Sequence, residues 1–495
     1  MIPSSRPLKH PRSRDGRATN CHKATEKARQ ASSPAQPAVS HRAAAIPRRA
    51  HLLLVCVFLA GPCSCAHRTP YYRKDQVHQV APLGGAEIDH RLLLIGDAGD
   101  PDRAGEPTLQ LLAQRVRELP ERTTVVFLGD NAYERGMPEP VEQPSDKAAD
   151  VAKQVVDTVF LDLFANREQA ERVLNAQLDV VRGTAAHVIF IPGNHDWDQF
   201  EVGGWRRIQE EEKFIKTSAA DSGMDGTMLP AGGCPGPAPV ALGTRGELIV
   251  LDTEWWLDSR VDGKPTTENN PTHCAYTTER QVRDALVAQL EEASNQHRWS
   301  IVAGHHPLES NGPHGGFVDP LTHIFPFQIV RHYVPFYIEW IPLPLVGSLV
   351  VALRSCCSPS VQDMSNRHNR HMRNALSRSL LEAQRHGAAP LAYAAGHDHS
   401  LQVFEASHGA RYLLVSGLGS HARASDVGSS SRTLFAHSNS AHPGFMEVDF
   451  LCDGSVRLAV LESADDPAAG AEVFSSYLAR PGASPEDAGT ASGGR

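Results

Sequence analysis

Val188-Ile-Phe-Ile-Pro-Gly-Asn-His-Asp-Trp197 is a short apolar run that stops at a turn and is followed at once by polar side chains. The β-branched and aromatic residues Val188–Ile191 predict a buried strand, and the Pro-Gly pair after them ends it. In folds that alternate strands and helices, loops at the carboxyl ends of the strands surround the ligand crevice. Asn194, His195 and Asp196 are therefore candidate functional residues, although such a cluster alone is equally typical of a turn that bonds its own backbone.

The same arrangement recurs along the chain. Four further apolar runs end in Gly-Asp or Gly-His, and a fifth ends in an aspartate without the glycine: Arg91–Ile95 before Asp97, Thr123–Leu128 before Asp130, Ser300–Ala303 before His305, Leu391–Ala395 before His397, and Ile249–Leu251 before Asp252. Stretches of helical period lie between them, as in Glu279–Ala293, where Val282, Leu286 and Leu290 share one face. Alternating strands and helices predict a layered α/β sheet covered on both faces.

The carboxyl-terminal part has a different pattern. Three strand-like runs follow one another there without intervening helices: Tyr412–Val415, Phe445–Val448 and Val456–Val460. They predict a second, more antiparallel sheet packed on the first. After Ser463 the chain is rich in Ala, Gly, Pro and Asp, so we expect residues 463–495 to be a frayed tail. We expect residues 67–90 to be a linker and 91–462 to be the folded domain.

Seven polar residues meet at the ends of the expected strands: Asp97, Asp130, Asn194, His195, His305, His397 and His399. One histidine in such a turn is usually a structural residue, but five strands that end alike are hard to explain that way. A glycine ahead of each turn leaves room for a close approach. Mixed Asp, Asn and His ligands suit divalent or trivalent metals, and a shared carboxylate allows two of them. The sequence therefore predicts a metal site.

These turns resemble the five ordered motifs of calcineurin-like metallophosphoesterases, and most closely those of the purple (tartrate-resistant) acid phosphatase branch. The superfamily in general has a histidine where this chain has Gly99, whereas the purple branch has a tyrosine at the position of Tyr133. The resemblance spans about Arg91 to Glu462, with specific motifs and little similarity between them. It implies a four-layer α/β fold, an αββα sandwich of two packed mixed β-sheets flanked by helices, with a dinuclear metal site at the carboxyl ends of the strands.

The resemblance also implies two sets of metal ligands. One metal would take Asp97, Asp130, Tyr133 and His399, and the other Asp130, Asn194, His305 and His397, with Asp130 bridging. Three anionic groups around the first ion favour Fe(III), and the second set suits Fe(II), Zn(II) or Mn(II). Two cations about 3.5–4 Å apart can activate water and clamp phosphoryl oxygens.

His195 follows a ligand without being one, so we expect it to protonate the leaving group of the substrate. Alternatively, it donates a hydrogen bond to Asp196 or to a backbone carbonyl and only orients the site. Asp196 and His306 are the other catalytic candidates, and His306 is either substrate-facing or structural. The expected activity is hydrolysis of phosphate monoesters. Phosphodiesters, phospholipid phosphates and a non-catalytic metal-binding module are the alternatives.

The amino-terminal fifty residues carry eleven Lys and Arg against two acids, a charge of +9. Because the whole chain has a net charge of −9, the remainder carries −9 − 9 = −18, which argues against a nucleic-acid partner.

Residues 48–66 combine a basic start with the apolar run Leu52–Ala60. This run is too short to span a bilayer, and the segment predicts export to the periplasm, the membrane surface or the outside. Cys63 and Cys65 raise lipid attachment as an alternative to simple cleavage. We expect residues 1–47 to be a disordered basic extension, which fits a start codon placed too far upstream. Nothing in the sequence indicates an oligomeric state.

Cys234 and Cys274 lie in Pro/Gly-rich loops on either side of the run Glu247–Asp252. In an oxidising compartment they could pair, and two separate thiols are the alternative, because spacing does not determine connectivity.

An insertion at residues 317–358 departs from the family pattern. Seven aromatic residues lie between Phe317 and Trp340, and Pro335, Pro342 and Pro344 interrupt helices, which leaves Leu345–Leu353 as the longest apolar run. It is too short to cross a bilayer. Either the insertion packs on the domain and walls the site, or residues 317–353 form an amphipathic lid at the membrane interface with Phe336, Tyr337 and Trp340 as anchors.

Overall fold

The computed structural model describes residues 69–74, 88–101, 105–140, 167–200, 203–257, 274–327, 336–420, 424–464 and 470–480. All of them lie within one compact unit, Pro62–Arg495. The predictions for residues 1–66, including the export segment and lipid attachment, fall outside the described residues.

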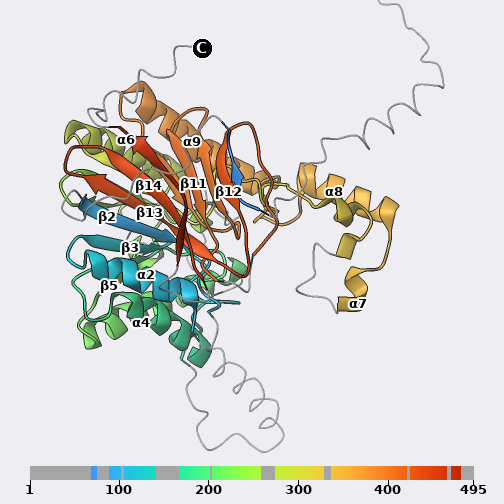
Figure 1. Ribbon diagram of the computed structural model, residues 1–495, viewed down its shortest axis with the longest axis horizontal. Coiled ribbons are helices and arrows are strands. Elements are labelled where there is room, and N and C mark those ends of the chain that lie inside the picture. Colours follow the sequence, from blue (N-terminus) through green and yellow to red (C-terminus); the bar gives the residue numbers. More distant parts are fainter. Residues whose placement is uncertain are drawn as a thin grey trace, which may run out of the picture. The chain divides into compact units, whose positions relative to one another are not determined.

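Two mixed β-sheets form the centre of this unit (Figure 1). The first sheet has seven strands in the spatial order β15 (Ala471–Ala479), β14 (Val456–Glu462), β13 (Gly444–Leu451), β2 (Ile88–Ile95), β3 (Thr123–Phe127), β4 (His187–Phe190) and β5 (Asp225–Met228). The second has eight, in the order β1 (Tyr71–Tyr72), β12 (Thr433–His437), β10 (Leu401–Glu405), β11 (Tyr412–Ser416), β9 (Ala392–Ala395), β8 (Trp299–Ala303), β7 (Gly246–Val250) and β6 (Ala238–Leu242).

Helices cover the outer face of each sheet. α2 (Pro107–Glu118) and α4 (Gly204–Asp221) pack on the seven-stranded sheet, and α6 (Glu279–Asn295) and α9 (Arg367–Arg385) pack on the eight-stranded sheet. Between the sheets lies one apolar core that both supply, with Leu94 and Ile189 on one side and Leu248 and Ile301 on the other. The predicted four-layer αββα sandwich is confirmed.

The predicted apolar face of α6 is also confirmed. Val282, Leu286 and Leu290 are fully buried, because α6 lays this face on α9 and on the eight-stranded sheet. The side chain of Thr278 caps the start of the helix in a reciprocal pair with Gln281.

Three details of the predicted organisation were wrong. The carboxyl-terminal strands do not form a sheet of their own: β10 to β12 join the eight-stranded sheet, and β13 pairs with β2 in the other, with Met446 opposite Leu94. The supposed tail contains β15, an edge strand paired with β14. The supposed linker contains β1, which pairs with β12, and the first residues of β2. Strand pairing across hundreds of residues decides these features, and local composition does not show it.

The insertion contains α7 (Phe336–Glu339) and α8 (Pro344–Cys357). Pro344 does not interrupt a helix, because it occupies the first turn of α8, where its missing N–H is tolerated. Among the described residues, no helix is long and apolar enough to cross a membrane. The short helix α5 (Glu254–Leu257) follows β7.

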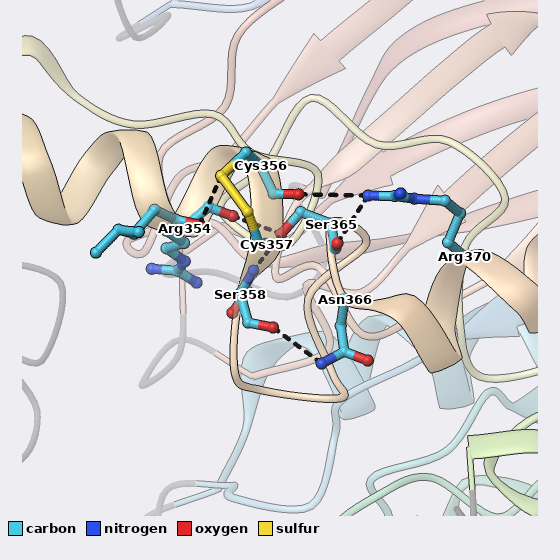
Figure 2. The surroundings of a disulfide bond; sticks show 8 residues. Arg354, Cys356, Cys357, Ser358, Ser365, Asn366 and Arg370 are labelled. Carbon is cyan, nitrogen blue, oxygen red and sulfur yellow. Dashed lines mark hydrogen bonds between the residues drawn. A yellow bond between two sulfur atoms is a disulfide. The ribbon is translucent and has the colours of Figure 1, made fainter.

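Two disulfides are present in the described part of the chain. Cys234 pairs with Cys274, which settles the alternative that the sequence left open. Cys356 and Cys357 at the end of α8 pair with each other, and nothing in the sequence analysis anticipated this (Figure 2).

Candidate metal centre

The candidate site lies where the carboxyl ends of strands from both sheets meet. Three of its residues directly follow strands of the seven-stranded sheet and two follow strands of the eight-stranded sheet: Asp97 after β2, Asp130 after β3, Asn194 after β4, His305 after β8 and His397 after β9. Parallel strands within each sheet bring their carboxyl ends to the same edge. The two packed sheets therefore bring together residues that are 300 positions apart, as in the hydrogen bond from the His397 backbone N–H to Asp97 Oδ2 at 2.7 Å.

The first group of donor atoms surrounds the hydroxyl of Tyr133. That oxygen lies 3.1 Å from Asp97 Oδ1, 3.1 Å from Asp130 Oδ2 and 3.3 Å from His399 Nε2. His399 Nε2 is in turn 3.3 Å from Asp97 Oδ1. Asp97 and Asp130 are buried, so both carboxylates lie out of water beside a phenol and an imidazole. This is the donor set expected for the first metal.

The second group joins Asn194, His305 and His397. The Asn194 Oδ1 atom lies 3.0 Å from His305 Nε2 and 3.1 Å from His397 Nδ1, and these two nitrogens are 3.2 Å apart. The other ring nitrogen of each histidine faces a backbone carbonyl: His305 Nδ1 is 2.9 Å from Leu128 O, and His397 Nε2 is 3.0 Å from Gln362 O. A carbonyl oxygen can only accept a hydrogen bond, so the proton of each neutral ring sits there.

The tautomers have a direct consequence for this second group. A neutral ring whose outer nitrogen carries the proton turns a lone pair toward the Asn194 oxygen. Burial lowers the pKa of His397 well below its usual value, together with the neighbouring histidines, so the ring is neutral. One oxygen and two imidazole nitrogens within 3.2 Å of one another are donor types that suit a metal cation. The donor chemistry of this chain therefore fits a metal ion here.

Asp130 connects the two groups. Its Oδ2 belongs to the first group, whereas its Oδ1 lies 3.5 Å from His305 Nε2 and accepts a hydrogen bond from the His195 backbone N–H at 2.9 Å. Burial raises the pKa of Asp130, but His305, His195 and the backbone N–H outweigh burial and lower the pKa to about 2. An ionised carboxylate with one oxygen toward each group is suited to bridge two cations.

The backbone is held in an uncommon conformation at three of these residues. Asp97, Asp130 and His397 have φ angles of 59°, 55° and 69°, in the left-handed region that costs energy for residues with a side chain. Gly193 supports this geometry, because a Cβ atom there would stand 2.3 Å from the backbone N of Asp130. Glycine at this position therefore lets the loop after β4 approach the loop after β3 closely, as the sequence predicts.

Gly99 has a steric role that the sequence did not reveal. A Cβ atom at this position would lie 2.5 Å from the carbonyl oxygen of Asp130 and 2.6 Å from the carbonyl carbon of Asn131. The loop that carries Tyr133 occupies this space, and the Tyr133 backbone N–H donates to Gly99 O at 3.2 Å. A histidine at residue 99 would not fit beside this loop.

His195 lies at the edge of the first group. Its Nδ1 is 2.6 Å from the carbonyl oxygen of Glu134, so this nitrogen carries a proton, and its Nε2 is 4.0 Å from Asp130 Oδ2. A carboxylate oxygen of Glu134 lies 3.9 Å from Nδ1. The side chain is 12% exposed, unlike the buried histidines of the second group. His195 therefore has the access to solvent that a proton donor to a substrate needs.

Asp196 is fully buried and turns both oxygens toward backbone and amide N–H groups. Oδ1 accepts from the backbone N–H groups of Asn131 and Ala132, and Oδ2 accepts from the Gly193 backbone and the Asn131 side chain. It thereby ties the loop after β3 to the loop after β4.

His306 is also fully buried, on the inner side of its neighbour His305. Its Nδ1 is 2.9 Å from the Thr253 hydroxyl, and its Nε2 is 2.7 Å from Gln362 Oε1 and 3.2 Å from Glu254 Oε2. Burial lowers the pKa of His306 well below its usual value, with His305 as the next cause. Both ring nitrogens are thus occupied by the surrounding protein, although His305, His306 and His397 lie close enough to form a possible ligand triad.

Two residues that the sequence analysis did not select reach the second group from the two flanks of the insertion. The ring of His314 lies 4.2 Å from the ring of His397, centre to centre, and its Nδ1 is 2.9 Å from Asp363 Oδ1. Gln362 supplies the carbonyl that fixes the tautomer of His397. Neither residue follows a strand, so the strand-turn pattern gave no signal for them.

Residues 90–331 match the family described as calcineurin-like phosphoesterase. This segment carries Asp97, Asp130, Tyr133, Asn194 and His305, and the two sheets with their flanking helices form the αββα sandwich of metallophosphoesterases. Dinuclear metal sites are typical of this family, as the two donor groups would require.

Two solved structures are similar to the chain at low identity. GAP50, the anchor in the inner membrane complex of Plasmodium, is 14% identical, with a TM-score of 0.45 over 79% of this chain and 88% of that one. A dimetal phosphatase from Danio rerio is 12% identical, with a TM-score of 0.37 over 79% of this chain and 99% of that one. A comparison with curated proteins gives no match.

Proposed function

We propose that this protein hydrolyses phosphate monoesters with a pair of metal ions. The observation that carries the proposal is the second donor group, in which Asn194 Oδ1, His305 Nε2 and His397 Nδ1 lie within 3.2 Å of one another. The first group supports it, because Tyr133 lies between two carboxylates. When bound, the metal pair supplies a nucleophile from water and neutralises the charge of the phosphoryl group.

We assign Fe(III) to the first position and Fe(II), Zn(II) or Mn(II) to the second. Asp97, Asp130 and a Tyr133 phenolate would place three hard anionic oxygens around the first ion, which favours a trivalent cation. Asn194 and two neutral imidazoles favour a divalent one. Asp130 serves both positions with its two oxygens.

His195 is the proposed proton donor to the leaving group. Its Nδ1 proton is held by the Glu134 carbonyl, which leaves Nε2 facing the site. Asp130 Oδ2 lies 4.0 Å from Nε2, and a ring that carries a proton on this nitrogen can donate it to the leaving oxygen. We assign positioning roles to the other two catalytic candidates, Asp196 and His306, because their polar atoms are occupied within the protein.

We propose that the protein works in an exported, oxidising environment. The Cys234–Cys274 disulfide supports this, since such bonds persist mainly outside the reducing cytosol. The sequence of residues 48–66 points the same way.

The function is tested by hydrolysis of p-nitrophenyl phosphate and bis(p-nitrophenyl) phosphate, before and after removal of metal with a chelator. We expect turnover of the monoester to exceed that of the diester, to vanish on chelation and to return with added iron and zinc. Faster turnover of the diester would replace the proposal with a phosphodiesterase. No turnover by a fully metallated protein would favour a metal-binding module.

A further inference from the structure

Exposed large apolar side chains are concentrated in one segment. Among the described residues, every exposed large hydrophobic side chain lies between residues 321 and 353. They come from the turn before α7, from α7 and α8, and from the loop between these helices: Leu321, Ile324, Tyr337, Trp340, Ile341, Leu343, Leu345, Val346, Leu349 and Leu353. We call these ten residues the apolar surface. Apolar side chains exposed together in one segment are typical of a contact with another molecule.

The helix α8 has two different faces. Leu345 is 88% exposed, and Leu349 and Leu353 follow it at intervals of four residues, so they share one face that is open to solvent. The opposite face packs on the preceding turn through Gly347, where a Cβ atom would lie 2.4 Å from the carbonyl oxygen of His323. No charged residue occurs from Pro344 to Leu353. The helix is therefore held in place on one side and presents an uncharged aliphatic face on the other.

We propose that the apolar surface docks into the interfacial layer of an anionic lipid bilayer. The fourteen residues of α8 give a length of about 21 Å at 1.5 Å per residue, short of the roughly 30 Å hydrocarbon core. The helix would therefore lie along the interface without crossing it. Tyr337 and Trp340, 69% and 50% exposed, carry the ring types that prefer the boundary between lipid chains and water.

Charge around the carboxyl end of α8 favours an anionic lipid surface. The exposed residues Arg367 and Arg370 stand in the first turn of α9, which contains no acid before Glu382. Figure 2 shows the Arg370 guanidinium beside the end of α8, where it donates to the carbonyl of Cys356 and to that of Ser365. The whole chain is acidic on balance, with a net charge of −9, so this basic end would also set the orientation of docking.

The helix α8, which carries part of the apolar surface, is linked to the metal site through Arg354. Arg354 of α8 pairs with Asp363, and Asp363 also bonds His314. One residue earlier, the carbonyl of Gln362 holds His397. Docking would therefore place the site beside the lipid surface. The docking proposal itself does not depend on the phosphatase activity.

Co-sedimentation with vesicles tests the proposal. The protein is a chain starting at Ala66, which lacks the apolar run Leu52–Ala60 and keeps every described element of the unit Pro62–Arg495. We expect it to bind vesicles that contain phosphatidylserine more tightly than pure phosphatidylcholine. The double variant Leu345→Glu, Leu349→Glu should lower the partition coefficient at least about tenfold, since it removes the apolar contact. The matched pair Leu345→Met, Leu349→Met should retain binding.

The arginines are tested in the same assay. Arg367→Gln with Arg370→Gln should remove the preference for phosphatidylserine and its sensitivity to salt. Arg280→Gln, at a side chain on α6 that is 90% exposed, is the control and should change neither. Turnover of p-nitrophenyl phosphate should stay unchanged in every variant, which shows that each one is folded.

Two outcomes would overturn the docking proposal. One is a chain from Ala66 that sediments with neither type of vesicle, or whose binding survives the glutamate pair. The other is a dimer in light scattering that the glutamate pair splits, because a second copy of the chain would then cover the apolar surface. A failure of the proposed phosphatase function would show itself separately, as absent turnover in a chain that still binds vesicles.

Discussion

The hydroxyl oxygen of Tyr133 lies 3.1 Å from Asp97 Oδ1. A phenol buried against a carboxylate can donate one proton, but a trivalent cation between them would instead hold both as anions. Phenolate bound to iron(III) absorbs visible light, so we expect protein prepared with iron to be coloured. Tyr133→Phe should bleach it and weaken metal binding at the first position.

Visible absorption of iron-loaded protein checks this expectation. Tyr393→Phe is the matched control, because Tyr393 is also buried but donates its hydroxyl proton to the His306 carbonyl. Its colour should persist. A colourless wild type that holds two equivalents of iron would rule out Tyr133 as a ligand.

His195→Ala should slow esters with poor leaving groups more than esters with good ones. A proton donor contributes about 10²-fold or more when the departing oxygen needs a proton, and little when it leaves as a stable anion. The measurement is kcat for an alkyl phosphate and for p-nitrophenyl phosphate, with metal content checked in both proteins. Equal losses for the two substrates would argue that His195 only orients the site.

Asp196→Asn should weaken metal binding by about 10- to 100-fold, as expected when a residue that orients ligands is changed. The carboxylate of Asp196 holds the backbone beside Asp130 and Asn194, and an amide cannot accept all four N–H groups. Because the role is one of positioning, kcat should recover when metal is added in excess. A loss of kcat that persists at saturating metal would instead show that Asp196 takes part in the chemistry.

The Asp196–Glu211 pair should give the fold a pH dependence. Burial raises the pKa of Asp196 well above its usual value, with the charge of Glu211 as the next cause, and burial raises the pKa of Glu211 to about 8. The four N–H donors around Asp196 favour the charge there, so the proton lies on Glu211. The folded chain then keeps a proton that the unfolded chain loses near pH 4.5, and stability falls as pH rises from 4.5 to about 8.

We expect the substitution Glu211→Gln to remove this pH dependence of stability. The substitution keeps the oxygen that accepts from Asn131 and places an amide where Glu211 Oε2 has no hydrogen-bond partner among the described residues. The urea midpoint of wild type should drop between pH 5 and about 8.5 more than that of the variant. Parallel profiles would show that Glu211 is ionised throughout.

The strand ends were predictable because the relevant information is local. A buried run followed by glycine and a polar residue predicts both the strand and the turn, and parallel strands place Asp97, Asp130 and Asn194 at one edge. The sequence also placed His305 and His397 at strand ends of the same kind, but it did not show that their strands β8 and β9 belong to the other sheet.

What the sequence could not show depends on pairing over long distances. β13 lies next to β2 and not beside its neighbour β12, because the core between the sheets needs apolar strands on both sides. Gln362 and His314 reach the site from loops whose sequences contain no strand-turn pattern. The placement of the His397 proton required the position of the Gln362 carbonyl.

The bridging role of Asp130 is the central claim, and metal content per chain tests it most directly. We expect about two ions per wild-type chain, and Asp130→Asn should lose tight binding at both positions together with hydrolysis. Asp449→Asn, a change at another buried aspartate, paired with Arg91, should keep two ions. A wild type that holds a single ion, or an Asp130→Asn variant that still holds two and hydrolyses p-nitrophenyl phosphate, would contradict the account.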